Sequence, residues 1–229
     1  MFIDPLYLIM LAPAFILALL ASMLTRTTFS KYARVAASSR MRGAEAAARL
    51  LERSGVRDVT VERTTGFLSD HYDPRTRTLR LSDNVYNSHS LAAIGVACHE
   101  AGHAIQHAQH YAPLGLRSAL VPVTQIGTLA PYIILPLGFI LGSLFLIKLG
   151  IALFALVVLF ALVTLPVEWD ASARAKRLMV SAGIVSPAEQ RQAGQVLNAA
   201  FLTYVAAAVS ALLTLLYFLL RSGLLGARR

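Results

Sequence analysis

Two histidines and a glutamate in residues 99–103 are the side chains of this sequence best suited to chemistry. The stretch reads His-Glu-Ala-Gly-His, an H-E-x-x-H pattern. Residues four apart share one face of a helix, so His99 and His103 can present two imidazoles to one cation. Glu100 projects to the side of that pair, where it can take a proton from water without binding the cation. The pattern therefore predicts a zinc site with Glu100 as its base.

The sequence around the motif favours a metal over solvated surface histidines. Small apolar residues precede it, and Asn87 or Ser88 can cap a helix that runs to about His110. An acid and two imidazoles inside an apolar helix are costly unless they are paired or bound to metal. Cys98, the one cysteine, excludes an internal disulfide and is interpreted as a packing residue rather than a nucleophile.

A catalytic zinc has three protein ligands, so one more must be found. His107 continues the same helix face, but it lies about 12 Å along the axis from His99 at 1.5 Å per residue. A zinc–nitrogen bond is only about 2.1 Å long, so one straight helix cannot bring all three histidines to one ion. His107 and His110 are better explained as helix-end residues, or as hydrogen-bond donors behind the ligands.

The acids downstream of the motif are the remaining candidates, and they are Glu168, Asp170 and Glu189. We expect Glu168 to be the ligand, because it follows an apolar run on the same side of the membrane as the motif. Two alternatives stay open. Glu168 could be an interfacial acid paired with Arg174 or Lys176, and Asp170 could be a ligand or a partner of a zinc histidine.

The elements that must position these residues are largely apolar. Of 229 residues, 56% are hydrophobic and 14% are charged, against about 25% charged in soluble proteins. Four uncharged runs are long enough to cross a bilayer, which needs roughly 20 residues. They are residues 6–24, 118–147, 149–167 and 199–220, and the middle two form a hairpin with Lys148 at its tip.

Positive charge predicts the orientation. Most Lys and Arg lie in residues 25–117 and 168–198, which places these segments in the cytoplasm and both termini outside. Anionic lipid explains the net charge of +9, so we expect no nucleic-acid partner.

The polar part predicts a helix in 30–55, short strands around 59–61 and 79–81, a turn at 73–76, and then the motif helix. The expected fold is mainly α, a multi-pass membrane protein with four transmembrane helices and a small α+β zincin-like catalytic domain carrying the H-E-x-x-H helix. The predicted segments are an anchor (1–25), the catalytic region (26–117), a transmembrane hairpin (118–167), the third-ligand helix and cytoplasmic loop (168–198), and a last transmembrane helix with a tail (199–229).

The sequence resembles the bacterial membrane-anchored neutral zinc metallopeptidases, the YugP-like family. The similarity lies in "GFLSDHYDPRTRTLRLSDNVYNSHSLAAIGVACHEAGHAIQHA", "YAPLGLRSALVPV" and "LPVEWDASARA". The architecture is also similar to HtpX/Ste24 peptidases, in which a membrane hairpin and a glutamate ligand follow H-E-x-x-H. The resemblance implies a gluzincin site in a bacterial inner membrane, with one zinc on His99, His103 and Glu168, and Glu100 as base. Ser172 stands where HtpX/Ste24 peptidases have an aspartate.

These observations predict a metalloendopeptidase that cleaves membrane or membrane-proximal proteins at the cytoplasmic face. The strand at 76–82 is expected to bind substrate as an added strand. The candidates for stabilising the oxyanion are unranked, and a turn would equally explain the first two: His71, Tyr72, His107 and Arg174.

Two other functions stay open. A non-catalytic membrane adaptor or assembly factor could retain the zinc fold. A site-2-type intramembrane protease is disfavoured, because its L-D-G motif is absent and the motif helix is flanked by polar sequence. Gly138 and Gly142 would permit helix association, but the oligomeric state is not predicted.

Overall fold

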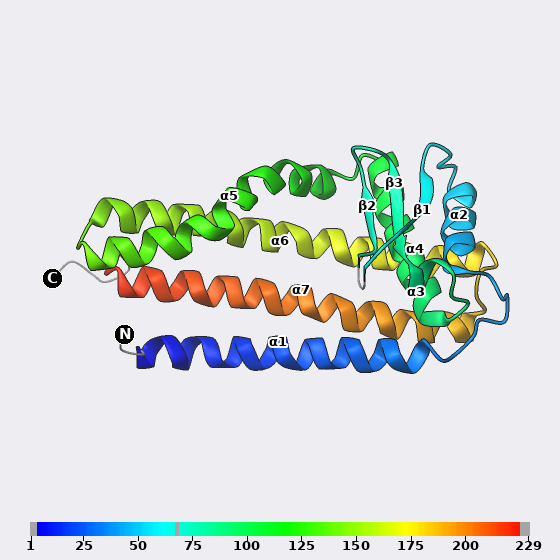
Figure 1. Cartoon of the computed structure of the whole chain (residues 1–229), viewed down its shortest axis with the longest axis horizontal. Coiled ribbons are helices and arrows are strands. Elements are labelled where there is room, and N and C mark those ends of the chain that lie inside the picture. Colours follow the sequence, from blue (N-terminus) through cyan, green and yellow to red (C-terminus); the bar gives the residue numbers. More distant parts are fainter. Residues whose placement is uncertain (1–3, 67–68, 225–229) are drawn as a thin grey trace. The chain divides into compact units, whose positions relative to one another are not determined.

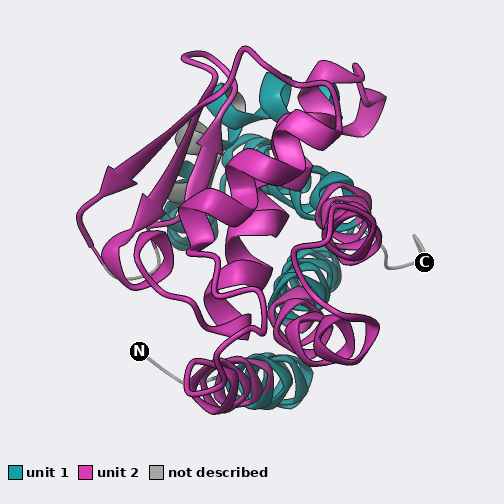
Figure 2. Ribbon diagram, turned by 90° about the vertical axis from the view of Figure 1, so that its right-hand side faces the viewer, with its two compact units in different colours: residues 1–20, 115–165, 203–229 teal, residues 21–114, 166–202 magenta. Residues whose placement is uncertain are grey.

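The computed structural model describes residues 4–66 and 69–224, which form two compact units (Figures 1 and 2). Unit 1 comprises Met1–Leu20, Gly115–Leu165 and Thr203–Arg229, and unit 2 comprises Ala21–Leu114 and Pro166–Leu202. The described elements are α1 (Pro5–Tyr32), α2 (Gly43–Arg53), β1 (Thr60–Thr64), β2 (His71–Asp73), β3 (Thr78–Ser82), α3 (Asp83–Tyr86), α4 (Leu91–Ala108), α5 (Ala112–Ile140), α6 (Leu144–Ser181) and α7 (Pro187–Arg221).

Unit 2 contains a three-stranded sheet in the order β1-β3-β2. The strands predicted from residues 59–61 and 79–81 are present as β1 and β3, whereas β2 was not predicted. Strand β3 pairs with β1 in parallel and with β2 antiparallel, so it is the middle strand. The expectation that β3 adds a substrate strand is therefore wrong, because both of its edges are occupied; β1 and β2 are the edge strands.

Helix α4 packs against the sheet and against α2 in unit 2 (Figure 2). Its N-cap is Ser90, whose Oγ accepts a hydrogen bond from the backbone N–H of Ala93 at 3.2 Å. The predicted caps were wrong because a short helix, α3, comes first and ends beside Asn87. The helix predicted over 30–55 is also interrupted: α1 ends at Tyr32 and α2 begins at Gly43.

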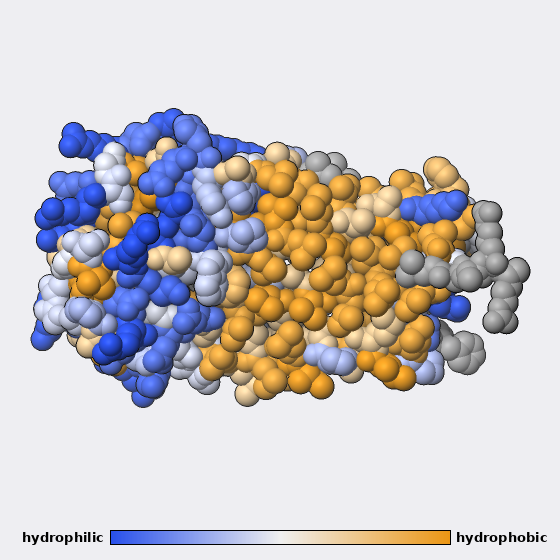
Figure 3. Space-filling view, turned by 180° about the vertical axis from the view of Figure 1, so that it is seen from behind, coloured by the Kyte–Doolittle hydropathy of each residue, from blue (hydrophilic) through white to orange (hydrophobic). Residues whose placement is uncertain are grey.

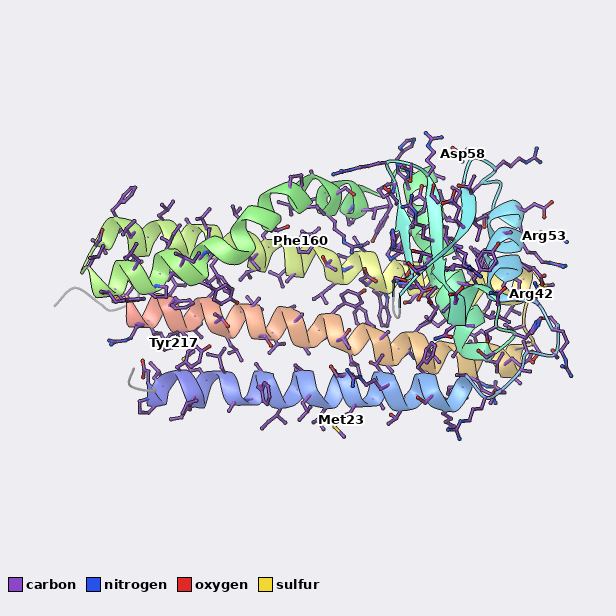
Figure 4. The ribbon with its side chains drawn as sticks, in the orientation of Figure 1. Met23, Arg42, Arg53, Asp58, Phe160 and Tyr217 are labelled. Atoms are coloured by element: carbon purple, nitrogen blue, oxygen red, sulfur yellow. The ribbon has the colours of Figure 1, made fainter. Side chains whose placement is uncertain are left out.

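Unit 1 contains the turn between α5 and α6 at residues 141–143. Gly142 adopts a φ of +62°, which glycine reaches without steric cost. Lys148 lies inside α6, so the prediction that it marks the hairpin tip was wrong. Also in unit 1, the two ends of the chain are joined by a hydrogen bond. The Tyr217 hydroxyl of α7 (Figure 4) donates to Asp4 Oδ2, just before α1, at 2.8 Å.

Among the described residues, three helices are long and apolar enough to cross a membrane: α1, α6 and α7. The run predicted over 118–147 is not recovered as a fourth span. Its described apolar stretch, Ala130–Ile140, is shorter, and α5 contains Pro122, Pro131 and Pro136. Unit 1 exposes many large apolar side chains, including Ile9, Phe15 and Phe145, and a broad hydrophobic area is visible in Figure 3. These features are those of a membrane protein.

Candidate metal centre

Three side chains from α4 and α6 converge in unit 2. One ligand atom from each of His99, His103 and Glu168 lies within 4.8 Å of the others. Glu168 Oε2 is 3.1 Å from His99 Nε2 and 3.6 Å from His103 Nε2. Glu168 and His103 are buried, with 1% and 7% of their surfaces exposed. Two imidazole nitrogens and one carboxylate oxygen form the donor set of a catalytic zinc site, so these residues fit that ion.

Gly102, inside the motif, allows the two helices to meet. A Cβ atom at this position would lie 2.6 Å from the backbone oxygen of Ala171 in α6. Real Cβ atoms do not approach that closely, so any larger residue would force the helices apart. Ala171 is one turn after Glu168, and the close approach at Gly102 therefore brings the Glu168 carboxylate to the histidines.

Each histidine has a neutral hydrogen-bond partner on its other ring nitrogen. Ser172 Oγ lies 3.0 Å from His99 Nδ1, and Gln106 Oε1 lies 3.0 Å from His103 Nδ1. In the tautomer that leaves Nε2 available to a cation, both Nδ1–H groups donate. Such partners fix the ring orientation and the tautomer of a metal ligand. Ser172, which differs from the aspartate expected from HtpX/Ste24 peptidases, thus contacts a candidate metal ligand directly.

Gln106 connects His103 to a wider network. Its side-chain Nε2 donates to the Val167 carbonyl and to Asp170 Oδ2, both at 2.8 Å. Asp170 also accepts from Arg174 Nε, and Arg174 donates in turn to Gln109 Oε1. Asp170 is therefore linked to His103 through Gln106 and is not one of the three candidate ligands. Of the two cations considered as partners of Glu168, Arg174 donates to Asp170 and Lys176 donates to Asn198.

Glu100 follows His99 in α4 and is not part of the ligand group. It is partly exposed, in contrast to the fully buried Ala101 and Gly102 that follow it. The protein around the Glu100 carboxyl removes part of its hydration, which raises its pKa above the ordinary value. The nearby imidazoles of His99 and His103 only partly oppose this effect. A carboxyl with a raised pKa accepts protons better at neutral pH than an ordinary one does.

The remaining predicted residues lie on β2 and at the end of α4. The Tyr72 hydroxyl is 2.8 Å from His107 Nδ1, and both side chains are half-buried. His107 is outside the ligand group, in agreement with its distance along the helix. His71 is exposed and donates from Nδ1 to the Ser69 carbonyl at 2.7 Å. The third downstream acid, Glu189, accepts from Ser38 and Ser186 instead.

Sequence reasoning missed Gln106, which is fully buried and contacts a candidate ligand directly. The signal was present: a glutamine three residues after His103 falls on the buried side of an apolar helix, where an amide needs partners. Ser172 was noticed only as a departure from related peptidases. Its contact with His99 could not be foreseen, because it depends on the packing of α6 against α4.

Comparison with known proteins identifies the cation. A family model described as "Putative neutral zinc metallopeptidase" matches residues 7–223. The chain belongs to this family. The chain is also 49% identical over 196 residues to the "Putative membrane protease YugP" of Bacillus subtilis (strain 168), covering 85% of this chain and 87% of that protein. No solved structure matches the chain. The resemblance found in the sequence is thus confirmed, and zinc is the metal for which this group of residues is suited.

Proposed function

We propose that this chain is a membrane-embedded zinc endopeptidase of the gluzincin type, with His99, His103 and Glu168 as ligands and Glu100 as base. The observation that carries the proposal is the convergence of one carboxylate and two imidazole nitrogens within 4.8 Å, in a member of a zinc metallopeptidase family. Three protein ligands leave a fourth position for water or substrate, as catalytic zinc requires.

The chemistry is hydrolysis of a peptide bond. Bound zinc supplies a Lewis acid that makes water a stronger acid and polarises the scissile carbonyl. Glu100 takes the proton from the attacking water and delivers it to the leaving amine nitrogen. Ser172 and Gln106 hold the two imidazoles in place, so that their Nε2 atoms remain directed at the ion.

The edge strand β2 is the proposed substrate-binding strand, because no strand among the described residues pairs with its second edge and because it contacts α4. An extended peptide bound there lies next to Tyr72, whose hydroxyl is hydrogen-bonded to His107. We assign stabilisation of the oxyanion to this pair.

In this proposal residues 26–117 and 168–198 form the cytoplasmic catalytic part, and residues 1–25, 118–167 and 199–229 anchor it in the bacterial inner membrane.

The test is Glu100→Gln in the full-length chain. The variant is expected to retain one zinc per chain and to lose proteolysis by about 10²–10⁴-fold, the usual contribution of a general base. Glu52→Gln, on the exposed face of α2, is the matched control and should keep full activity. An active Glu100→Gln protein contradicts the mechanism. A wild-type protein that holds zinc but cleaves no membrane-proximal substrate supports the non-catalytic adaptor instead.

A further inference from the structure

The apolar segments of three helices end at one level within unit 2. The uncharged part of α1 ends at Arg26 and that of α6 at Glu168, and the apolar part of α7 begins at Ala199, directly after Asn198. The Thr25 hydroxyl donates to the Ala199 carbonyl at 2.9 Å, which places the boundaries of α1 and α7 side by side. Trp169 and Phe201 pack edge to face with ring centroids 5.2 Å apart, which does the same for α6 and α7.

Trp169 is exposed at this boundary. It shows 56% of its surface, whereas its neighbour Glu168 shows 1%. Lys176 reaches back along α6, so that its ammonium lies 5.4 Å from the centre of the Trp169 ring. Tryptophan concentrates at the headgroup level of bilayers, and lysine near a helix end extends its charge toward lipid phosphates. An exposed ring beside an ammonium, at the end of three apolar segments, has the chemistry of a headgroup contact.

We propose that Trp169 binds in the lipid headgroup layer and thereby fixes Glu168 at the depth of the membrane surface. This inference rests on the proposed function for its consequence: the substrates are protein segments within a few residues of the bilayer. A chain in extended form covers about 3.3 Å per residue, so a short tether is enough to bring such a segment to the site.

The chain offers a direct measurement, because Trp169 is its one tryptophan. The full-length protein is reconstituted into phosphatidylcholine–phosphatidylglycerol vesicles whose acyl chains carry bromine at known depths. Trp169 fluorescence is expected to be quenched most by the shallowest bromine and least by bromine at the bilayer centre. Strongest quenching by the deepest bromine, or no quenching by any, would overturn the proposal.

Two matched variants calibrate the depth, both in a Trp169→Phe background. Phe201→Trp should report the same shallow level. Leu212→Trp lies further along α7, at an exposed position about 16 Å deeper by helix rise, and should be quenched most by the deepest bromine. The fluorescence depends on neither zinc nor activity, and Glu100→Gln must give the same depth. Failure of the proposed function is thus distinguishable from failure of this proposal.

The substrate class is tested with a single-span protein that carries one cleavable sequence at increasing distance from its membrane segment. Cleavage is expected when that sequence lies within a few residues of the bilayer and should fall at least tenfold when it is 30 residues away. Equal cleavage at both distances overturns the substrate class.

Discussion

The two histidines of α4 that are proposed to bind zinc are held in different ways. His103 is buried, and its partner Gln106 is itself fixed by Val167 and by an Asp170–Arg174 pair. His99 is more exposed, with 14% of its side chain accessible, and has one partner hydroxyl, from Ser172. The difference teaches that the ring of His103 is oriented by a buried network of several groups, whereas the Nδ1 side of His99 is oriented by one hydroxyl from α6.

The largest expected effect comes from breaking both sides at once. Gly102→Ala inserts a methyl group 2.6 Å from the Ala171 oxygen, so α6 must move away from α4 and take both Glu168 and Ser172 with it. We expect zinc affinity to fall by about 100-fold or more, beyond the loss of one supporting contact. Titration with a competing chelator measures this. Gly115→Ala is the control, because nothing lies within 4 Å of its added methyl group.

Removing the support on the buried side should have the next largest effect. Gln106→Ala leaves the Nδ1–H of His103 without its acceptor and the Val167 carbonyl without its donor, both in a buried setting. Zinc affinity should fall by about 10–100-fold, the usual cost of losing a hydrogen-bond partner behind a ligand. Gln192→Ala in α7 is the matched control and should bind zinc nearly as well as wild type, because the hydrogen bonds of Gln106 do not involve Gln192.

The exposed side should tolerate the same kind of change better. Ser172→Ala removes the partner of His99, but 14% of this side chain is accessible, so a water molecule can take the place of the hydroxyl. We expect less than about a tenfold loss of zinc affinity, the lower bound for such partners, and tighter binding for Ser172→Asp. If Ser172→Ala weakens zinc more than Gln106→Ala does, the contrast between the two sides is wrong.

The smallest effect concerns Glu100, whose carboxyl lies near both histidines. Burial raises its pKa, so the zinc-free fold favours the protonated form. The associated stability is complete below the ordinary pKa of 4.5 and is lost as the pH rises through the folded pKa. Zinc-free Glu100→Gln should therefore unfold at a higher temperature than zinc-free wild type at pH 7, and at the same temperature below about pH 4. Thermal unfolding in detergent at both pH values measures the difference.

The sequence predicted the parts of the site that depend on local spacing. His99 and His103 could be paired because helix geometry relates residues four apart, and the same geometry excluded His107. Glu168 was expected from its place after an apolar run and from the resemblance, whereas its contacts with the histidines depend on the packing of α6 on α4, which local patterns do not encode. Strand β2 was missed because three residues carry too little alternation of polar and apolar side chains to be recognised. The turn between α5 and α6 was misplaced because the one charge in the apolar run, Lys148, was taken to mark it, whereas it lies at Gly142.

The close approach of Gly102 to Ala171 also bears on how the enzyme is made. Residue 168 is synthesised after the motif helix and after the apolar residues that separate them, so a nascent chain carries both histidines without their carboxylate partner. Helix α6 must be translated and packed before the ligand set is complete. The proposed hydrolytic centre therefore cannot form, or act on its own growing chain, before α6 has been synthesised and packed against α4.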